Sequence, residues 1–157
     1  MDKNTIQRLI ILSFIAGFAF GLPAVVPYIG GVSLFALLFL ASPLVMLLLI
    51  MGGKYDISTV QNSIIHGGII GFVVNISYSF SYCAMSAILY LIFKFTTNYF
   101  LTAMIINSPV WLLIISVIFI SFLTAVTNAF SGFVIYYVIN LIRDLYEKKH
   151  KNDTNNM

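Results

Sequence analysis

The fold is decided by residues 109–142, which read PVWLLIISVIFISFLTAVTNAFSGFVIYYVINLI and include no Asp, Glu, Lys or Arg. Residues 107–109, Asn-Ser-Pro, form a polar cap followed by proline at the first helical position. Trp111 lies near one end of the stretch, and Tyr136 and Tyr137 lie near the other, about 37 Å away along a helix. Membrane proteins concentrate aromatic residues at two headgroup levels with about this separation. The stretch therefore predicts one continuous membrane-spanning helix.

The composition of the whole chain agrees with this interpretation. Of 157 residues, 61% are hydrophobic and only 8% are charged, whereas soluble domains are about half apolar and about a quarter charged. So few charged side chains cannot cover the surface of a soluble domain, but a surface that faces lipid does not need them. The net charge is +3, and six of the eight basic residues lie near the two ends, with no basic stripe for nucleic acid. Cys83 is the only cysteine, so no disulfide can form within the chain.

Three further apolar runs have a suitable length, since about 20 residues cross a bilayer. They cover residues 9–26, 32–51 and 64–93. Pro43 lies inside the second run, where we expect it to kink the helix. This second run is rich in Leu, Phe and Met, so we expect it to be the most lipid-exposed of the four.

The third run is longer than a span requires. Residues 58–61, Ser-Thr-Val-Gln, resemble a capping box in which Ser58 covers the first backbone donors. No helix-breaking residue follows before Lys94, which predicts a single helix that begins in the headgroup region. Two shorter helices, divided near residues 77–83, are the alternative, although each would be short for a span.

Together these runs predict an all-α integral membrane protein, an antiparallel bundle of four transmembrane helices. The membrane domain covers residues 1–145, with residues 95–107 along the outer surface and a disordered tail over 146–157. Basic residues decide the orientation, because cytoplasmic loops carry an excess of Lys and Arg. With four spans only Lys94 is outside, so both termini are expected in the cytoplasm of a bacterial cell. Cleavage of the first run as a signal peptide, near Gly21, would instead leave three spans.

Polar residues form two stripes at helical spacing. One stripe on the third run contains Asn75, Ser79, Tyr82 and Ser86, and one on the fourth contains Ser121, Thr124, Asn128 and Ser131. On the opposite face of the third helix lie His66, Ser77 and Ser81. Because asparagine is costly against lipid, the stripes should face the interior. They could form hydrogen bonds in a dry helix contact, or line a hydrated cavity for a small neutral solute.

Small residues repeat every four positions on the first, third and fourth runs. The candidate packing positions are Gly17 and Gly21, Gly67 and Gly71, and Ala125 and Ala129. Small residues let helix backbones approach closely in a membrane. They predict either packing inside the bundle or a docking face for a second copy or another membrane protein.

The predicted spans contain few side chains that could take part in catalysis or proton transfer. All five acidic residues lie outside the predicted spans, so proton relays and paired carboxylates are excluded there. His66 is the only histidine within a span, and we expect headgroup water to reach it. We therefore predict no catalytic residue, metal or cofactor. Two functions remain, a non-enzymatic membrane subunit or scaffold and a small transporter or channel component. The layout is similar to that of many small four-span bacterial proteins, but no motif identifies a family.

Overall fold

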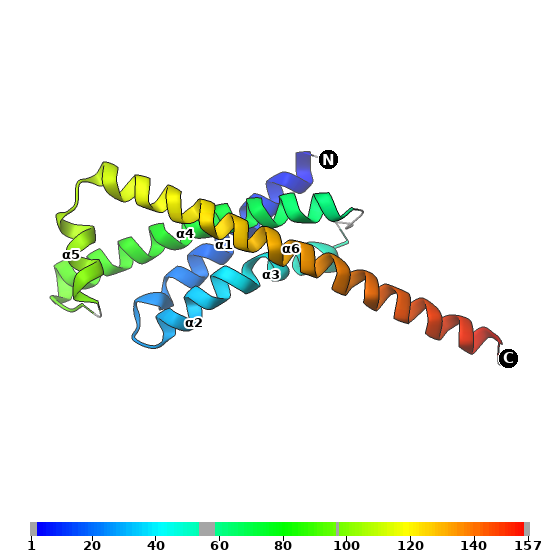
Figure 1. Ribbon diagram of the computed structural model, residues 1–157. Coiled ribbons are helices and arrows are strands. Elements are labelled where there is room, and N and C mark those ends of the chain that lie inside the picture. Colours follow the sequence, from blue (N-terminus) through cyan, green and yellow to red (C-terminus); the bar gives the residue numbers. More distant parts are fainter. Residues whose placement is uncertain (1–2, 54–58, 97, 156–157) are drawn as a thin grey trace.

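The computed structural model describes residues 3–53, 59–96 and 98–155, and this part of the chain is helical apart from short connections, with no strand (Figure 1). The elements in chain order are α1 (Lys3–Gly21), the 3-10 turn η1 (Pro23–Val25), α2 (Ile29–Phe35), the π-helical turn η2 (Ala36–Leu40), α3 (Ala41–Met51), α4 (Val60–Phe93), α5 (Tyr99–Asn107) and α6 (Val110–Asn155).

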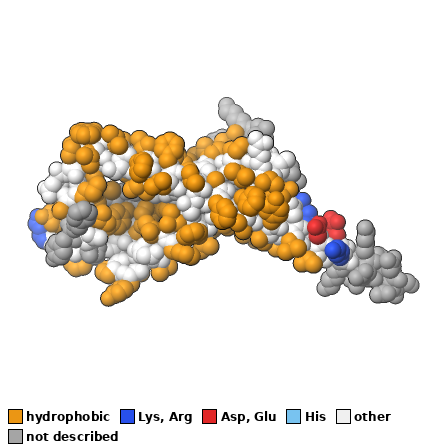
Figure 2. Space-filling model, viewed as in Figure 1, with side chains coloured by type: hydrophobic (Ala, Val, Ile, Leu, Met, Phe, Trp, Pro, Cys, Tyr) orange, Lys and Arg blue, Asp and Glu red, His pale blue; other side chains and the backbone are white. Residues whose placement is uncertain are grey.

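Four helical segments are long and apolar enough to cross a membrane. They are Asn4–Val25, Ile29–Met51, Val60–Phe93 and Val110–Lys148. The four predicted spans are therefore confirmed as apolar helices of sufficient length. Figure 2 shows an apolar surface over most of the visible face, with the Lys, Arg, Asp and Glu side chains at its two ends.

Helix α4 is continuous over 34 residues, so the alternative of two helices divided near residues 77–83 is wrong. The cap is Thr59, whose hydroxyl accepts a hydrogen bond from the Asn62 N–H at 3.3 Å. The predicted role of Ser58 lies outside the described residues. The helix ends where expected, because Lys94 adopts a left-handed conformation with φ of 52°.

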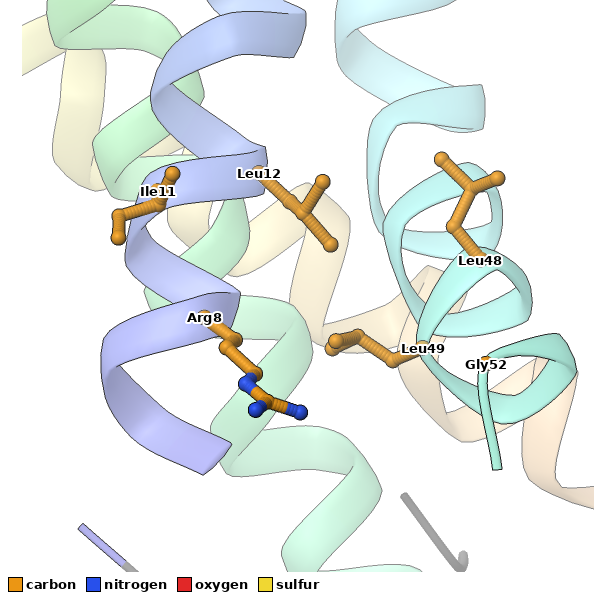
Figure 3. Close-up of a pocket in the computed structure, with 6 residues that line it drawn as sticks. All are labelled: Arg8, Ile11, Leu12, Leu48, Leu49 and Gly52. Atoms are coloured by element: carbon orange, nitrogen blue, oxygen red, sulfur yellow. The ribbon is translucent and has the colours of Figure 1, made fainter. Parts of the chain in front are cut away.

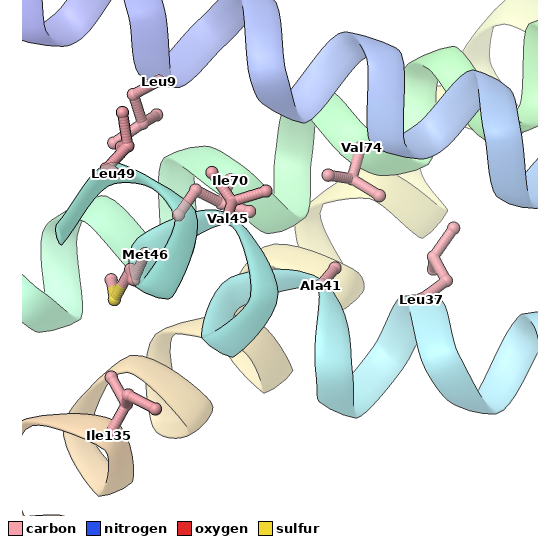
Figure 4. Packing of buried hydrophobic residues seen from close by; sticks show 9 residues of the cluster. All are labelled: Leu9, Leu37, Ala41, Val45, Met46, Leu49, Ile70, Val74 and Ile135. Atoms are coloured by element: carbon pink, nitrogen blue, oxygen red, sulfur yellow. The ribbon is translucent and has the colours of Figure 1, made fainter. Parts of the chain in front are cut away.

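A hydrophobic core joins all four long segments (Figure 4). It consists of Leu9, Leu37, Ala41, Val45, Met46, Leu49, Ile70, Val74 and Ile135. Seen along the chain, one residue comes from α1, five come from η2 and α3, two come from α4 and one comes from α6. The second segment thus supplies most of the core.

The prediction that the second run is the most lipid-exposed is wrong. In the most apolar 18-residue stretch of each segment, 39% of the residues are buried in the first, 33% in the second, 17% in α4 and 11% in α6. The second segment is in contact with α1, α4 and α6, and its buried residues are Ser33, Leu37, Ala41, Ser42, Val45, Met46 and Leu49. Helix α6 is the most exposed of the four.

The C-terminal part of the chain also differs from the expectation. Residues 146–157 were expected to be disordered, but α6 continues as a helix to Asn155 and projects from the bundle (Figure 1). Residues with good helix propensity, Glu and Lys, are frequent here. Asp144 and Lys148 are also spaced i, i+4, a favourable arrangement on a helix.

Candidate functional site

Two opposite faces of α4 hold buried polar groups. On one face the Asn75 amide donates to the Ser121 hydroxyl of α6 at 2.8 Å. On the other face the Ser77 hydroxyl donates to the backbone carbonyl of Phe14 in α1 at 2.7 Å. Asn75 and Ser77 are 3% and 0% exposed, so water does not satisfy them. Hydrogen bonds therefore attach α4 to α6 on one side and to α1 on the other.

Asn128 makes the most elaborate polar contact of the described residues. Its Oδ1 accepts a hydrogen bond from the Ser42 backbone N–H at 2.9 Å, and its Nδ2 lies 3.1 Å and 3.2 Å from the carbonyl oxygens of Leu37 and Leu38. The same Nδ2 lies 3.1 Å from the carbonyl oxygen of Thr124. The Asn128 side chain of α6 thus completes the backbone hydrogen bonding of the second segment, at η2 and α3.

The contact with Asn128 occurs where the second segment is irregular. The π-helical turn η2, Ala36–Leu40, stands immediately before α3, and Pro43 follows in the first turn of α3. Proline has no N–H to donate, and the Ser42 N–H is turned to Asn128. A π-helical turn thus lies just before Pro43, and one amide bonds the backbone groups of Leu37, Leu38 and Ser42 there, as π-bulges and inserted side chains commonly interrupt helices.

The remaining stripe residues do not form a common site. The hydroxyls of Thr124 and Ser131 donate to the carbonyls of Ile120 and Thr127, within α6 itself. Ser86 is buried, at 5% exposed, farther along α4. Ser79 and Tyr82 line one cavity, and Ser131 lines a separate pocket beside Phe39 and Pro43. The two stripes hence contribute to helix contacts and to two separate pockets.

The predicted small residues lie in close helix contacts inside the chain. A Cβ added to Gly17 would lie 2.2 Å from the Val74 carbonyl oxygen, and one added to Gly67 would lie 2.4 Å from that of Asn128. Gly21 is equally tight against α4, where Tyr78 and Ser81 leave no space. Gly71 meets Thr124, Ala125 and Asn128, and Gly67 also approaches Ala129. The sequence interpretation missed Gly132, whose added Cβ would lie 2.4 Å from the Ser63 carbonyl oxygen.

A cavity of about 480 Å³ is lined by residues of η1, α2, α4, α5 and α6. Helices α2 and α5 lie at the same end of the bundle in Figure 1. The polar wall of the cavity is Tyr78, Ser79 and Tyr82 of α4, together with Asn98, the N-cap of α5. Its other lining residues are Ala24, Val25, Val26, Pro27, Tyr28, Gly30, Gly31, Leu34, Leu101 and Ile120, so no charged side chain borders it.

The tyrosine rings give the cavity a flat wall. The rings of Tyr78 and Tyr82 are nearly parallel, with centroids 6.3 Å apart and 5° between their planes. Within the described part of the chain, the hydroxyls of Tyr78, Ser79 and Tyr82 have no hydrogen-bond partner and remain able to bind a ligand. This cavity could hold a small neutral molecule.

His66 does not lie in water, contrary to the expectation. It is 2% exposed on α4, one turn from Ser63, whose buried hydroxyl has no hydrogen-bond partner. Over residues 3–53, 59–96 and 98–155, no three His, Cys, Asp or Glu side chains are grouped to hold a metal ion. His66 is therefore buried within the helix bundle.

Comparison of the chain with protein-family models, with curated proteins and with solved structures gives no significant match. The class of protein therefore comes from the geometry alone. The described chain is a helical bundle with four apolar helices, as in membrane proteins. Its features are internal polar contacts, glycine packing and one neutral cavity.

Proposed function

We propose that this chain is a non-enzymatic subunit or scaffold of a membrane, which acts through contacts between its helices and those of a partner. Its four helices would cross the bilayer in antiparallel order, with both termini in the cytoplasm. The basic residues near the chain ends and the single Lys94 on the opposite side support this orientation. The close packing of Gly17 and Gly21 on α4 supports a permanent place for α1 in the bundle.

The exposed face of α6 is the observation that carries this proposal. One stripe along the helix consists of Trp111, Ile115, Phe119, Phe122, Val126 and Phe130, which are 58–72% exposed. The steps between these positions are three or four residues, so they share one face. In the most apolar 18-residue stretch of this segment, only 11% of the residues are buried in the chain. An aromatic stripe of this kind can pack against another membrane helix, since association in lipid depends on van der Waals contact.

The length of α6 supports the same function. Its 46 residues correspond to about 69 Å of helix, more than twice the hydrocarbon thickness of about 30 Å. The part after the aromatic stripe continues outside the bundle, where Leu141, Leu145 and Tyr146 are 58–67% exposed. The same helix can therefore contact a partner both inside the bilayer and at the cytoplasmic surface.

The buried polar groups argue against a conduction pathway along the two stripes. Asn75 and Asn128 are 3% and 0% exposed, and their amides bond to groups of neighbouring helices. A pathway for ions or water would need these amides to face a hydrated space. This favours the scaffold over a channel.

A photo-crosslinking amino acid at Phe119 or Val126 is expected to form an adduct with one membrane protein in intact cells. The control carries the photo-crosslinking amino acid at Ile15 of α1 instead. Ile15 is 57% exposed but lies on a different helix. Replacing Phe119 by Ala in a chain labelled at Val126 should reduce the adduct at least tenfold, because aromatic residues dominate contact energies. Mass spectrometry identifies the adduct. Lipid adducts alone, or equal yields from Ile15, would contradict the proposal.

The neutral cavity supports a second function, the binding of a small neutral molecule that reaches the cavity from the outer side. Cavities of 300–1,000 Å³ hold small ligands in many proteins, and this one has about 480 Å³. The hydroxyls of Tyr78, Ser79 and Tyr82 favour a molecule with hydrogen-bond acceptors. The parallel tyrosine rings favour a planar one.

Coumarin, a neutral planar lactone, is a suitable probe for this cavity. Gly31→Trp is expected to reduce its binding at least tenfold, since Gly31 lines the cavity and an added Cβ meets no atom within 4 Å. Tyr82→Phe should weaken binding about fivefold, which corresponds to about 1 kcal/mol for one hydrogen bond. Equilibrium dialysis in detergent measures both, with Leu48→Ile as the control for partition into micelles. Equal binding by Gly31→Trp and wild type would exclude the cavity.

A further inference from the structure

A groove between α1 and α3 has a cationic mouth and an apolar floor. It measures about 350 Å³ and is lined by Arg8, Ile11, Leu12, Leu48, Leu49 and Gly52. Figure 3 shows the Arg8 side chain extending from α1 toward the end of α3, beside Leu49 and Gly52. Leu12 lies one turn beyond Arg8, about 6 Å along the helix axis. The groove thus changes from charged to apolar over one helical turn.

Arg8 also borders a second recess, which is polar. This recess of about 360 Å³ is lined by Asn4, Gln7, Arg8 and Ile11. No hydrogen bond or ion pair joins Arg8 to another described residue, so its guanidinium keeps five N–H donors for a ligand. The amide of Gln7 can add a donor on the same side. An anion is the natural ligand of such a group.

We propose that this groove binds one anionic phospholipid, with the phosphate on Arg8 and the upper part of an acyl chain on Ile11, Leu12 and Leu48. Guanidinium groups bind phosphate through two parallel hydrogen bonds. The apolar floor supplies the selectivity for a lipid over a free anion. The C-terminal end of α3, capped by Gly52, borders the groove. The partial negative charge of this helix end attracts Arg8 but repels a phosphate. Binding of the anion therefore depends on the Arg8 side chain.

This inference shares only the membrane setting with the proposed function, and it needs no protein partner. Native mass spectrometry of the detergent-solubilised chain tests it separately, with phosphatidylglycerol, phosphatidylcholine and inorganic phosphate as probes. The wild-type chain is expected to retain one phosphatidylglycerol at least fivefold more strongly than phosphatidylcholine, in line with one basic residue near an anionic headgroup.

Three variants decide the outcome. Arg8→Gln should remove the preference for phosphatidylglycerol, whereas Arg143→Gln, which removes an exposed arginine from the projecting part of α6, should retain it. Leu48→Trp should lower retention of phosphatidylglycerol, because the larger side chain fills the groove and leaves Arg8 in place. Leu48 is 49% exposed, so this change does not disturb the core.

Three results would overturn the proposal. Equal retention of the two lipids by the wild-type chain would show nonspecific lipid only. A preference that survives Arg8→Gln would place the anion elsewhere. Displacement of phosphatidylglycerol by millimolar inorganic phosphate, with no effect of Leu48→Trp, would identify a site for a free anion rather than for a lipid.

Discussion

Gly67→Ala is expected to lower the free energy of unfolding by about 3 kcal/mol, the upper range for overpacking. The added Cβ would lie 2.4 Å from the Asn128 carbonyl oxygen and 3.1 Å from the Ala129 Cα, both backbone atoms of α6. Backbone atoms cannot move aside as a flexible side chain can, so α4 and α6 must separate. The unfolding transition in mixed micelles, followed by circular dichroism as the SDS fraction rises, measures the loss.

Gly68→Ala is the matched control for this change. Its added Cβ would lie 3.8 Å from the nearest atoms of Ala125 and Ala129, an ordinary contact distance. Alanine is also the better helix former, so this variant should be as stable as wild type or slightly more stable. If both variants unfold together with wild type, the close approach of α4 and α6 is not present in the folded protein.

Asn128→Leu is expected to cost about 3 kcal/mol, although the two side chains are similar in size. The change removes the acceptor of the Ser42 N–H and the donor to the carbonyls of Leu37 and Leu38. Hydrogen bonds between membrane helices contribute only about 0.6 kcal/mol on average. Here the amide satisfies backbone groups at a helix break, and an unsatisfied backbone group in an apolar medium costs several kcal/mol. The cost of the unsatisfied backbone groups is the larger of the two, so it should determine the loss in free energy of unfolding.

Thr127→Val is the control for Asn128→Leu, because it also removes one polar group from α6. The Thr127 hydroxyl donates only to the Leu123 carbonyl of its own helix, at 3.1 Å. Its loss should change the free energy of unfolding by less than about 0.5 kcal/mol, the usual range for surface positions. The same SDS titration compares the two variants. A cost for Asn128→Leu no larger than that for Thr127→Val would show that the helix break does not need the amide.

Local sequence patterns predicted the number of apolar helices and several of their ends. Lys94 was a reliable end for α4, since no helix-breaking residue precedes it and the chain there turns left-handed. Pro109 marked the start of α6 to within one residue, at Val110. Such signals depend only on residues a few positions apart, so they can be identified from the sequence without knowledge of the tertiary contacts.

Contacts between distant residues explain what the sequence did not predict. Pro43 suggested a kink, but the π-helical turn also requires Asn128, which lies 86 residues after Ser42. The burial of part of the second segment has a similar cause, since its composition does not reveal which of its residues contact α4 and α6. Gly132 had a detectable signal, because Ala125, Ala129 and Gly132 repeat at steps of four and three.

The candidate site was only partly predictable for the same reason. The helical spacing placed Asn75 and Ser79 on one stripe, yet Asn75 lies in a helix contact and Ser79 lines a cavity. The difference arises where η1 and α2 turn away from α4 and leave room beside Tyr78. A stripe on one helix does not reveal where the neighbouring chain departs from it.

The bond between Ser42 and Asn128 imposes an order on the synthesis of the chain. Ribosomes add about 5–20 residues per second, so Asn128 follows Ser42 after roughly 4–17 s. During this interval the carbonyls of Leu37 and Leu38 have no amide donor to bond. Transfer of the second helix into lipid is therefore less favourable than it is after Asn128 has been added. We expect the insertion machinery to retain this helix until the fourth one emerges. A messenger truncated before codon 128 should therefore yield a product that the membrane's proteases remove rapidly.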